Sequence, residues 1–147
     1  KCESPEQNPE PLPYLQQTGK HAYDINLQVA IQPENAVETV VSNSNFKYMY
    51  WTMSQQLAHH TINGCRVNSG DMMGSGTISG PTPDSFGSML ELSWGGQNPI
   101  KMNDGSERKF INDNDTVIIR GYCQNDKVRI GFGEVSSKLL PAIDLKF

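Results

Sequence analysis

The chain has 147 residues and a formal net charge of -4, which suits a single domain with a substantial buried core. Its lysines and arginines are scattered, so no basic patch could neutralise the phosphates of nucleic acid or of an anionic membrane surface. No apolar run is long enough to cross a bilayer. The three cysteines show no Cys-x-x-Cys spacing, which argues against a disulfide framework or a zinc site and favours a reducing compartment.

Residues 1–20 are predicted to be an extended, mobile lead-in, because they show no apolar periodicity and contain four prolines. The chain also lacks an initiator methionine. We therefore expect a fragment of a longer polypeptide.

Alternating apolar residues predict the β-strands. The alternation is strongest over Tyr23–Ile31, and a turn at Gln32–Asn35 then allows residues 36–42 to return as an antiparallel partner. A second strongly β segment covers residues 116–123, and Val128, Ile130 and Phe132 alternate along a further strand.

One principal helix is predicted at about residues 45–63, with Asn43, Ser44 or Asn45 as its N-cap and Gly64 at its end. Apolar residues recur every three to four positions and should face the core; this stripe consists of Phe46, Met49, Tyr50, Met53, Leu57 and His60. His59 and His60 fall in the last turns, where packing or C-cap hydrogen bonding is favoured over metal binding.

The segment from Gly74 to Trp94 is the candidate site. Residues 74–88 are mostly Gly, Ser, Thr and Pro, which predicts a long loop of the kind that often carries function. Alternation over residues 89–94 predicts a strand with Leu90, Leu92 and Trp94 on its core face and Glu91 on the other. Glu91 would then be either a site carboxylate beside a Gly-rich loop or an ordinary solvated charge.

Short strands and polar turns dominate the remainder, so the predicted fold class is a mainly β roll or sandwich with one principal helix. The polar turn over residues 112–115 lacks the Gly and the distant Glu of an EF-hand and is predicted to be a hydrated hairpin tip. The last segment, residues 138–147, is expected to dock on the core.

Several segments closely resemble the C-terminal part of the fumarylacetoacetate hydrolase family, in family order and over nearly the whole chain. The matching words are PLPYL (residues 11–15), NFKYMYWTM and QQLAHHTINGC (45–65), SGTISGP (75–81), FGSMLELSW (86–94), VIIRGYCQ (117–124) and RIGFGEV (129–135). The resemblance places residues 1–147 in the C-terminal portion of a catalytic β-roll domain. The upstream half of that domain and an N-terminal domain would then be absent.

The resemblance also implies a chemistry. Family members split a carbon–carbon bond of 4-fumarylacetoacetate, giving fumarate and acetoacetate in the last step of tyrosine catabolism. They are homodimers that hold calcium or magnesium through carboxylates, and a His oriented by a Glu activates water. Glu91 matches that Glu, and Thr77 matches a Thr that contacts the substrate. Cytoplasmic location and a small-molecule substrate follow from the same resemblance.

The chain departs from the family pattern in what it lacks. The metal carboxylates, the catalytic His and most substrate-gripping residues lie upstream in the family, so no metal ligand is assigned here. His21, His59 and His60 match no catalytic His motif. We therefore expect this chain alone to be inactive. The alternatives are a short non-catalytic paralogue that serves as a binding or regulatory subunit, and a β-sandwich that binds carbohydrate or peptide through Trp51 and Trp94.

Overall fold

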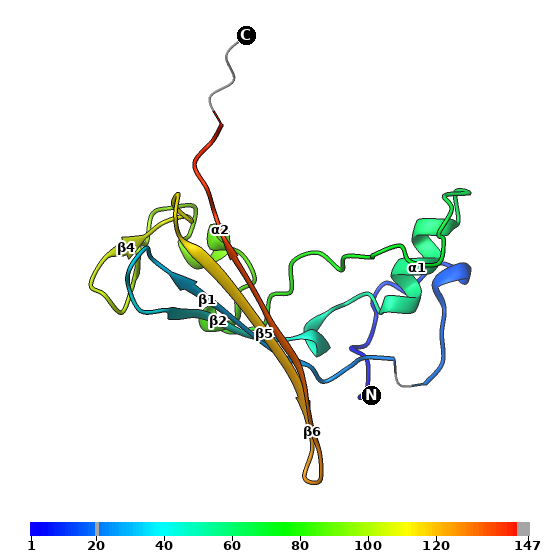
Figure 1. Cartoon of the computed structure of the whole chain (residues 1–147). Helices are drawn as coiled ribbons and strands as arrows, with labels where there is room; N and C mark the ends of the chain where they lie inside the picture. Colours follow the sequence, from blue (N-terminus) through cyan, green and yellow to red (C-terminus); the bar gives the residue numbers. More distant parts are fainter. Residues whose placement is uncertain (20, 144–147) are drawn as a thin grey trace.

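The computed structural model describes residues 1–19 and 21–143 and is mainly β, with one principal helix (Figure 1). This confirms the predicted fold class. The helices are α1 (Met53–Thr61) and α2 (Met89–Leu92). The strands are β1 (Asn26–Gln32), β2 (Thr39–Asn45), β3 (Ile100–Lys101), β4 (Glu107–Arg108), β5 (Thr116–Gln124) and β6 (Arg129–Lys138).

Four strands form one antiparallel sheet in the order β2-β1-β5-β6. The predicted hairpin is confirmed: β1 and β2 pair through the turn at residues 33–38, and Ala30 lies opposite Val40. Along its other edge β1 pairs with β5, and there Ala30 lies opposite Ile118. Ala30, Ile31 and Ile118 are all buried. The core of the sheet therefore lies where β1 and β5 meet.

The β5–β6 hairpin extends beyond the other strands as a long arm (Figure 1). Every residue of β6 is exposed, and the predicted alternation of Val128, Ile130 and Phe132 does not bury them, since 55–60% of each is exposed. β6 is an edge strand that covers no core.

The principal helix is shorter than predicted. Asn45 caps a separate 3-10 turn over Phe46–Tyr48 by accepting a hydrogen bond from the Lys47 N–H. The helix proper begins only at Met53, because Thr52 is its N-cap and forms a capping box with Gln55. The chain leaves the helix through Gly64, which has a φ of 88°, as expected of a terminating glycine.

The predicted core-facing stripe is wrong for α1, because Met53 and Leu57 are 49% and 45% exposed. Gln55 is the buried residue of the helix. Its side-chain amide donates to the carbonyl of Leu15 at 2.8 Å and to the side chain of Gln7 at 2.7 Å. The helix therefore packs on the lead-in, a polar contact that hydrophobic periodicity does not reveal.

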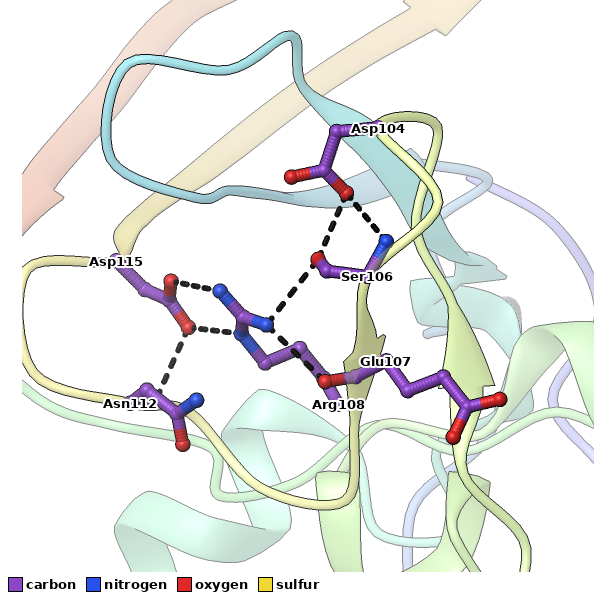
Figure 2. A network of polar contacts seen from close by, with 6 residues as sticks. All are labelled: Asp104, Ser106, Glu107, Arg108, Asn112 and Asp115. Atoms are coloured by element: carbon purple, nitrogen blue, oxygen red, sulfur yellow. Dashed lines mark hydrogen bonds and ion pairs between the residues drawn. The ribbon is translucent and has the colours of Figure 1, made fainter.

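The predicted hydrated turn at residues 112–115 is also wrong in one respect. Asp115 is 1% exposed and accepts both Nε and Nη2 of Arg108, at 2.8 and 2.9 Å (Figure 2). The same carboxylate accepts the backbone N–H of Asn112 at 2.9 Å. This bidentate ion pair ties β4 to the start of β5 and closes the loop between them.

Docking of the last segment is not seen in the part that the structure describes, since Leu140 and Ile143 are 73% and 85% exposed. Residues 144–147 lie outside the described residues. Cys2, Cys65 and Cys123 are unpaired. Within residues 1–19 and 21–143, no helix has the length and apolarity needed to cross a membrane.

Candidate functional site

Glu91 lies on the short helix α2 and not on a strand, so the predicted strand over residues 89–94 is wrong. Ser88 is the N-cap of α2, and its hydroxyl accepts the N–H of Glu91 at 3.3 Å. The predicted core face is absent as well: Leu90 and Trp94 are 62% and 65% exposed. A local capping interaction overrides the apolar alternation here.

The half-buried Glu91 carboxylate is held by two serine hydroxyls. Ser88 donates to Oε2 at 2.7 Å, and Ser79 donates to Oε1 and Oε2 at 2.8 and 2.9 Å. These donors, Ser88 first and then Ser79, hold the pKa of Glu91 below its usual range because they stabilise the ionised form. The site therefore keeps a fixed negative charge near neutral pH.

Thr77 is linked to Ser79 through Gly87. Gly87 donates its N–H to the hydroxyl of Ser79 at 3.1 Å. A Cβ built on Gly87 would lie 2.8 Å from Cγ2 of Thr77 and 2.5 Å from the carbonyl oxygen of Ile78. Gly87 thus packs directly against the Thr77–Ile78 backbone. Glu91 bonds to Ser79 and Thr77 lies close to Gly87, so both residues adjoin the Ser79–Gly87 hydrogen bond, and Thr77 is exposed.

Strand β2 anchors the loop that carries these residues. The hydroxyl of Ser42, a buried residue, donates to the carbonyl of Phe86 at 2.7 Å, and Ser44 donates to the carbonyl of Ile78 at 3.1 Å. The loop also closes on itself, because the Gly80 N–H donates to the carbonyl of Ser85 at 2.8 Å. Polar side chains on a β-strand therefore fix a Gly-rich loop that has little apolar surface of its own.

The histidines lie away from Glu91. His59 shares a 3.0 Å hydrogen bond with the hydroxyl of Tyr14, and His21 contacts the carbonyl of Thr18 at 2.6 Å. His59 and His60 belong to α1, which lies well apart from α2 (Figure 1). Among the described residues, no three or more His, Cys, Asp or Glu side chains gather as a metal site.

Sequence reasoning overlooked Ser79 and Ser88. The signal for Ser88 is present in the chain, since Ser88-x-x-Glu91 has the spacing of a capping box that starts a helix. Ser79 has no comparable local signal because its partner lies twelve residues away.

Comparison with known proteins agrees with this architecture. Residues 10–139 match the family model described as fumarylacetoacetate (FAA) hydrolase, C-terminal. The chain is 55% identical over 141 residues to the fumarylacetoacetase of Homo sapiens, which covers 95% of this chain and 34% of that protein.

Two further relatives give the same result. Identity is 52% over 142 residues with the fumarylacetoacetase of Caenorhabditis elegans and 46% over 142 residues with that of Arabidopsis thaliana. The alignments cover 95% and 96% of this chain, and 34% of each relative. The chain thus spans about a third of the length of these relatives. It belongs to the fumarylacetoacetate hydrolase family and corresponds to its C-terminal part.

Proposed function

We propose that this chain is the C-terminal part of a fumarylacetoacetase, which hydrolyses 4-fumarylacetoacetate to fumarate and acetoacetate in tyrosine catabolism. The observation that carries the proposal is the Glu91 carboxylate, which Ser79 and Ser88 fix beside the loop that carries Thr77. The similarity to fumarylacetoacetases over 95% of the chain supports the choice of substrate. A cytoplasmic homodimer is the corresponding assembly.

In this proposal Glu91 is the acid that orients the catalytic histidine. Its ionised carboxylate accepts the N–H of an imidazole supplied by the upstream part of the polypeptide. This contact fixes the tautomer, so that the other ring nitrogen can take a proton from water. The carboxylate also stabilises the imidazolium that forms. The hydroxyl of Thr77 donates to an oxygen of the substrate, either a carboxylate or the developing oxyanion.

Family members use a divalent cation, calcium or magnesium, to stabilise the charge that develops on the substrate. The described residues do not fit such an ion, because they contain no cluster of three or more ligating side chains. In this proposal the metal ligands come from the upstream part of the polypeptide, and this chain contributes the orienting acid and part of the substrate pocket.

Glu91→Gln in the full-length polypeptide tests the proposal. The amide keeps the shape of the side chain but removes the charge that stabilises the imidazolium, which develops mainly in the transition state. We expect kcat to fall by at least 100-fold, on the scale of lost acid–base assistance, with KM nearly unchanged. Steady-state kinetics with 4-fumarylacetoacetate measures both values, and wild-type kcat in the variant would remove Glu91 from the mechanism.

Thr77→Val is the companion test of the substrate contact. Valine is nearly isosteric but cannot donate a hydrogen bond. The loss should raise KM and lower kcat, so that the transition-state stabilisation measured by kcat/KM falls by about 1–3 kcal/mol. Unchanged kinetics would make Thr77 a loop residue without a substrate contact.

A second candidate function is a non-catalytic binding subunit. A half-open, mostly apolar cavity of about 580 Å³ lies between the lead-in and α1 and is lined by Leu12, Tyr14, Trp51 and His59 among others. Its size is within the range of small-molecule sites. The alternative in which Trp51 and Trp94 together bind carbohydrate or peptide is not supported, since Trp51 precedes α1 and Trp94 follows α2, and these two helices lie apart (Figure 1). The length of the parent open reading frame separates the two functions.

A further inference from the structure

The Glu91 carboxylate can accept more hydrogen bonds than its two serine partners donate. An ionised carboxylate accepts at about four lone-pair positions. Ser79 and Ser88 each have one hydroxyl proton, and the proton of Ser79 is shared between Oε1 and Oε2. Two side-chain protons therefore serve four positions, and the backbone N–H groups of Ser88 and Gly87 further stabilise the ionised form.

The direction of both hydroxyl protons is fixed by the backbone. The oxygen of Ser79 accepts the Gly87 N–H at 3.1 Å, and the oxygen of Ser88 accepts the Glu91 N–H at 3.3 Å. An oxygen that already accepts an N–H on one side is free to direct its own proton toward the carboxylate. Such chains of hydrogen bonds also polarise and strengthen one another.

The two serines come from different segments, one from the Gly-rich loop and the other from the N-cap of α2. A carboxylate held from two directions cannot rotate about its last side-chain bond without breaking one of the contacts. This matters for a residue that orients an imidazole, because a displacement of a catalytic group by about 1 Å greatly lowers the rate.

We propose that Ser79 and Ser88 are positioning residues, which hold the Glu91 carboxylate in the one orientation in which it accepts the histidine N–H. The proposal rests on the proposed function, because the histidine is supplied by that mechanism. It assigns a role to two serines that act only through Glu91 and do not touch the substrate.

Substitutions at Ser88 separate helix capping from hydrogen-bond donation. Asp is as good an N-cap as Ser, but its ionised side chain cannot donate to Glu91 and repels it. Thr retains the hydroxyl and so serves as the rescue variant. Ser79→Ala removes the second donor, and Ser75→Ala is the matched control, because Ser75 lies in the same loop and donates to the carbonyl of Gly76.

The experiment is steady-state kinetics of the full-length polypeptide across pH. For Ser79→Ala we expect kcat to fall about tenfold, with KM changed by less than about twofold, as for one lost hydrogen bond to a charged group. Ser88→Asp should lower kcat at least as far, because it also places a second negative charge beside Glu91. The acid limb of the kcat profile should move to higher pH, because Glu91 loses a donor that lowers its pKa. Ser88→Thr and Ser75→Ala should behave as wild type.

Failure of this inference differs from failure of the proposed function. If Glu91→Gln is inactive while Ser79→Ala and Ser88→Asp match wild type, the positioning role is overturned and the enzyme function stands. If the wild-type protein does not turn over 4-fumarylacetoacetate, the proposed function is overturned. The pKa of Glu91, followed by carboxyl-carbon NMR in the same variants, then decides the serine contacts: a rise supports them and no change overturns them.

Discussion

Gly87 is a position in the candidate site that leaves no room for a side chain. A Cβ there would lie 2.5 Å from the carbonyl oxygen of Ile78 and 2.8 Å from Cγ2 of Thr77, so the backbone itself would have to move. We expect Gly87→Ala to lower the free energy of unfolding by about 1–3 kcal/mol, as for other overpacked positions. It should also reduce turnover, because the displaced backbone carries Thr77.

Gly74→Ala is the control for that change, since a Cβ at Gly74 meets no atom within 4 Å. There we expect a neutral or slightly stabilising effect, of about 0.4–1 kcal/mol at most, through the lower entropy of the unfolded chain. Urea denaturation of both variants measures the difference. Equal stability of the two variants would contradict the packing described at Gly87.

For single residues, the sequence indicated candidate site residues but not the backbone structure around them. Glu91 and Thr77 were singled out through the family resemblance, and the structure brings both to the Ser79–Gly87 contact. Their backbone setting could not be deduced from alternation, because a four-residue helix such as α2 has almost no periodic signal. The Ser88-x-x-Glu91 spacing would have been a better guide to this helix, because it is the spacing of a capping box.

Among the elements, β1 was predicted from its period of two, β2 from the turn before it, and β5 from its run of residues that favour strands. The helix was predicted too long, since the pattern cannot separate the 3-10 turn at Phe46–Tyr48 from α1. The burial of Gln55 was also missed. A side chain that satisfies partners 40 and 48 residues away leaves no trace in local sequence.

The β4–β5 connection depends on the Arg108–Asp115 ion pair (Figure 2). Truncation of Asp115 would leave a largely buried guanidinium without its partner, which typically costs about 3–5 kcal/mol. We expect Asp115→Ala to destabilise the fold by that amount, and Asp113→Ala, at an exposed position in the same turn, to change stability by less than about 0.5 kcal/mol. Thermal and urea unfolding check both values.

The same ion pair predicts a pH dependence. The Arg108 hydrogen bond is the main cause that holds the pKa of Asp115 below its ordinary value. Stability from this pair is therefore fully present above about pH 4, the usual aspartate range, and is lost as the pH falls toward the lower folded-state pKa. The gap in unfolding free energy between wild type and Asp115→Ala should narrow below pH 4. A gap that stayed constant down to pH 2 would show that the ion pair is not its source.

The whole molecule exposes more surface than its mass requires. Its accessible area is 10553 Å², whereas a compact monomer of 16.3 kDa should expose about 7,500 Å². Exposed apolar side chains on the β5–β6 arm contribute to this area, since Ile130, Phe132 and Val135 are 57–65% exposed. Surface of this kind is typical of a protein that packs against further polypeptide.

The last prediction concerns the chain by itself. Glu91 has no imidazole beside it in the part of the chain that the structure describes, since His21 bonds to Thr18, His59 bonds to Tyr14, and His60 lies with His59 on α1. That part also has no cluster of metal ligands. We therefore expect the 147-residue chain to show no hydrolysis of 4-fumarylacetoacetate above the uncatalysed rate, with or without calcium or magnesium. The full-length polypeptide, assayed in parallel, is the positive control. Turnover by the isolated chain that disappears in Glu91→Gln would mean that the orienting acid finds its base within these residues, and the division of the site between two parts of the polypeptide would have to be abandoned.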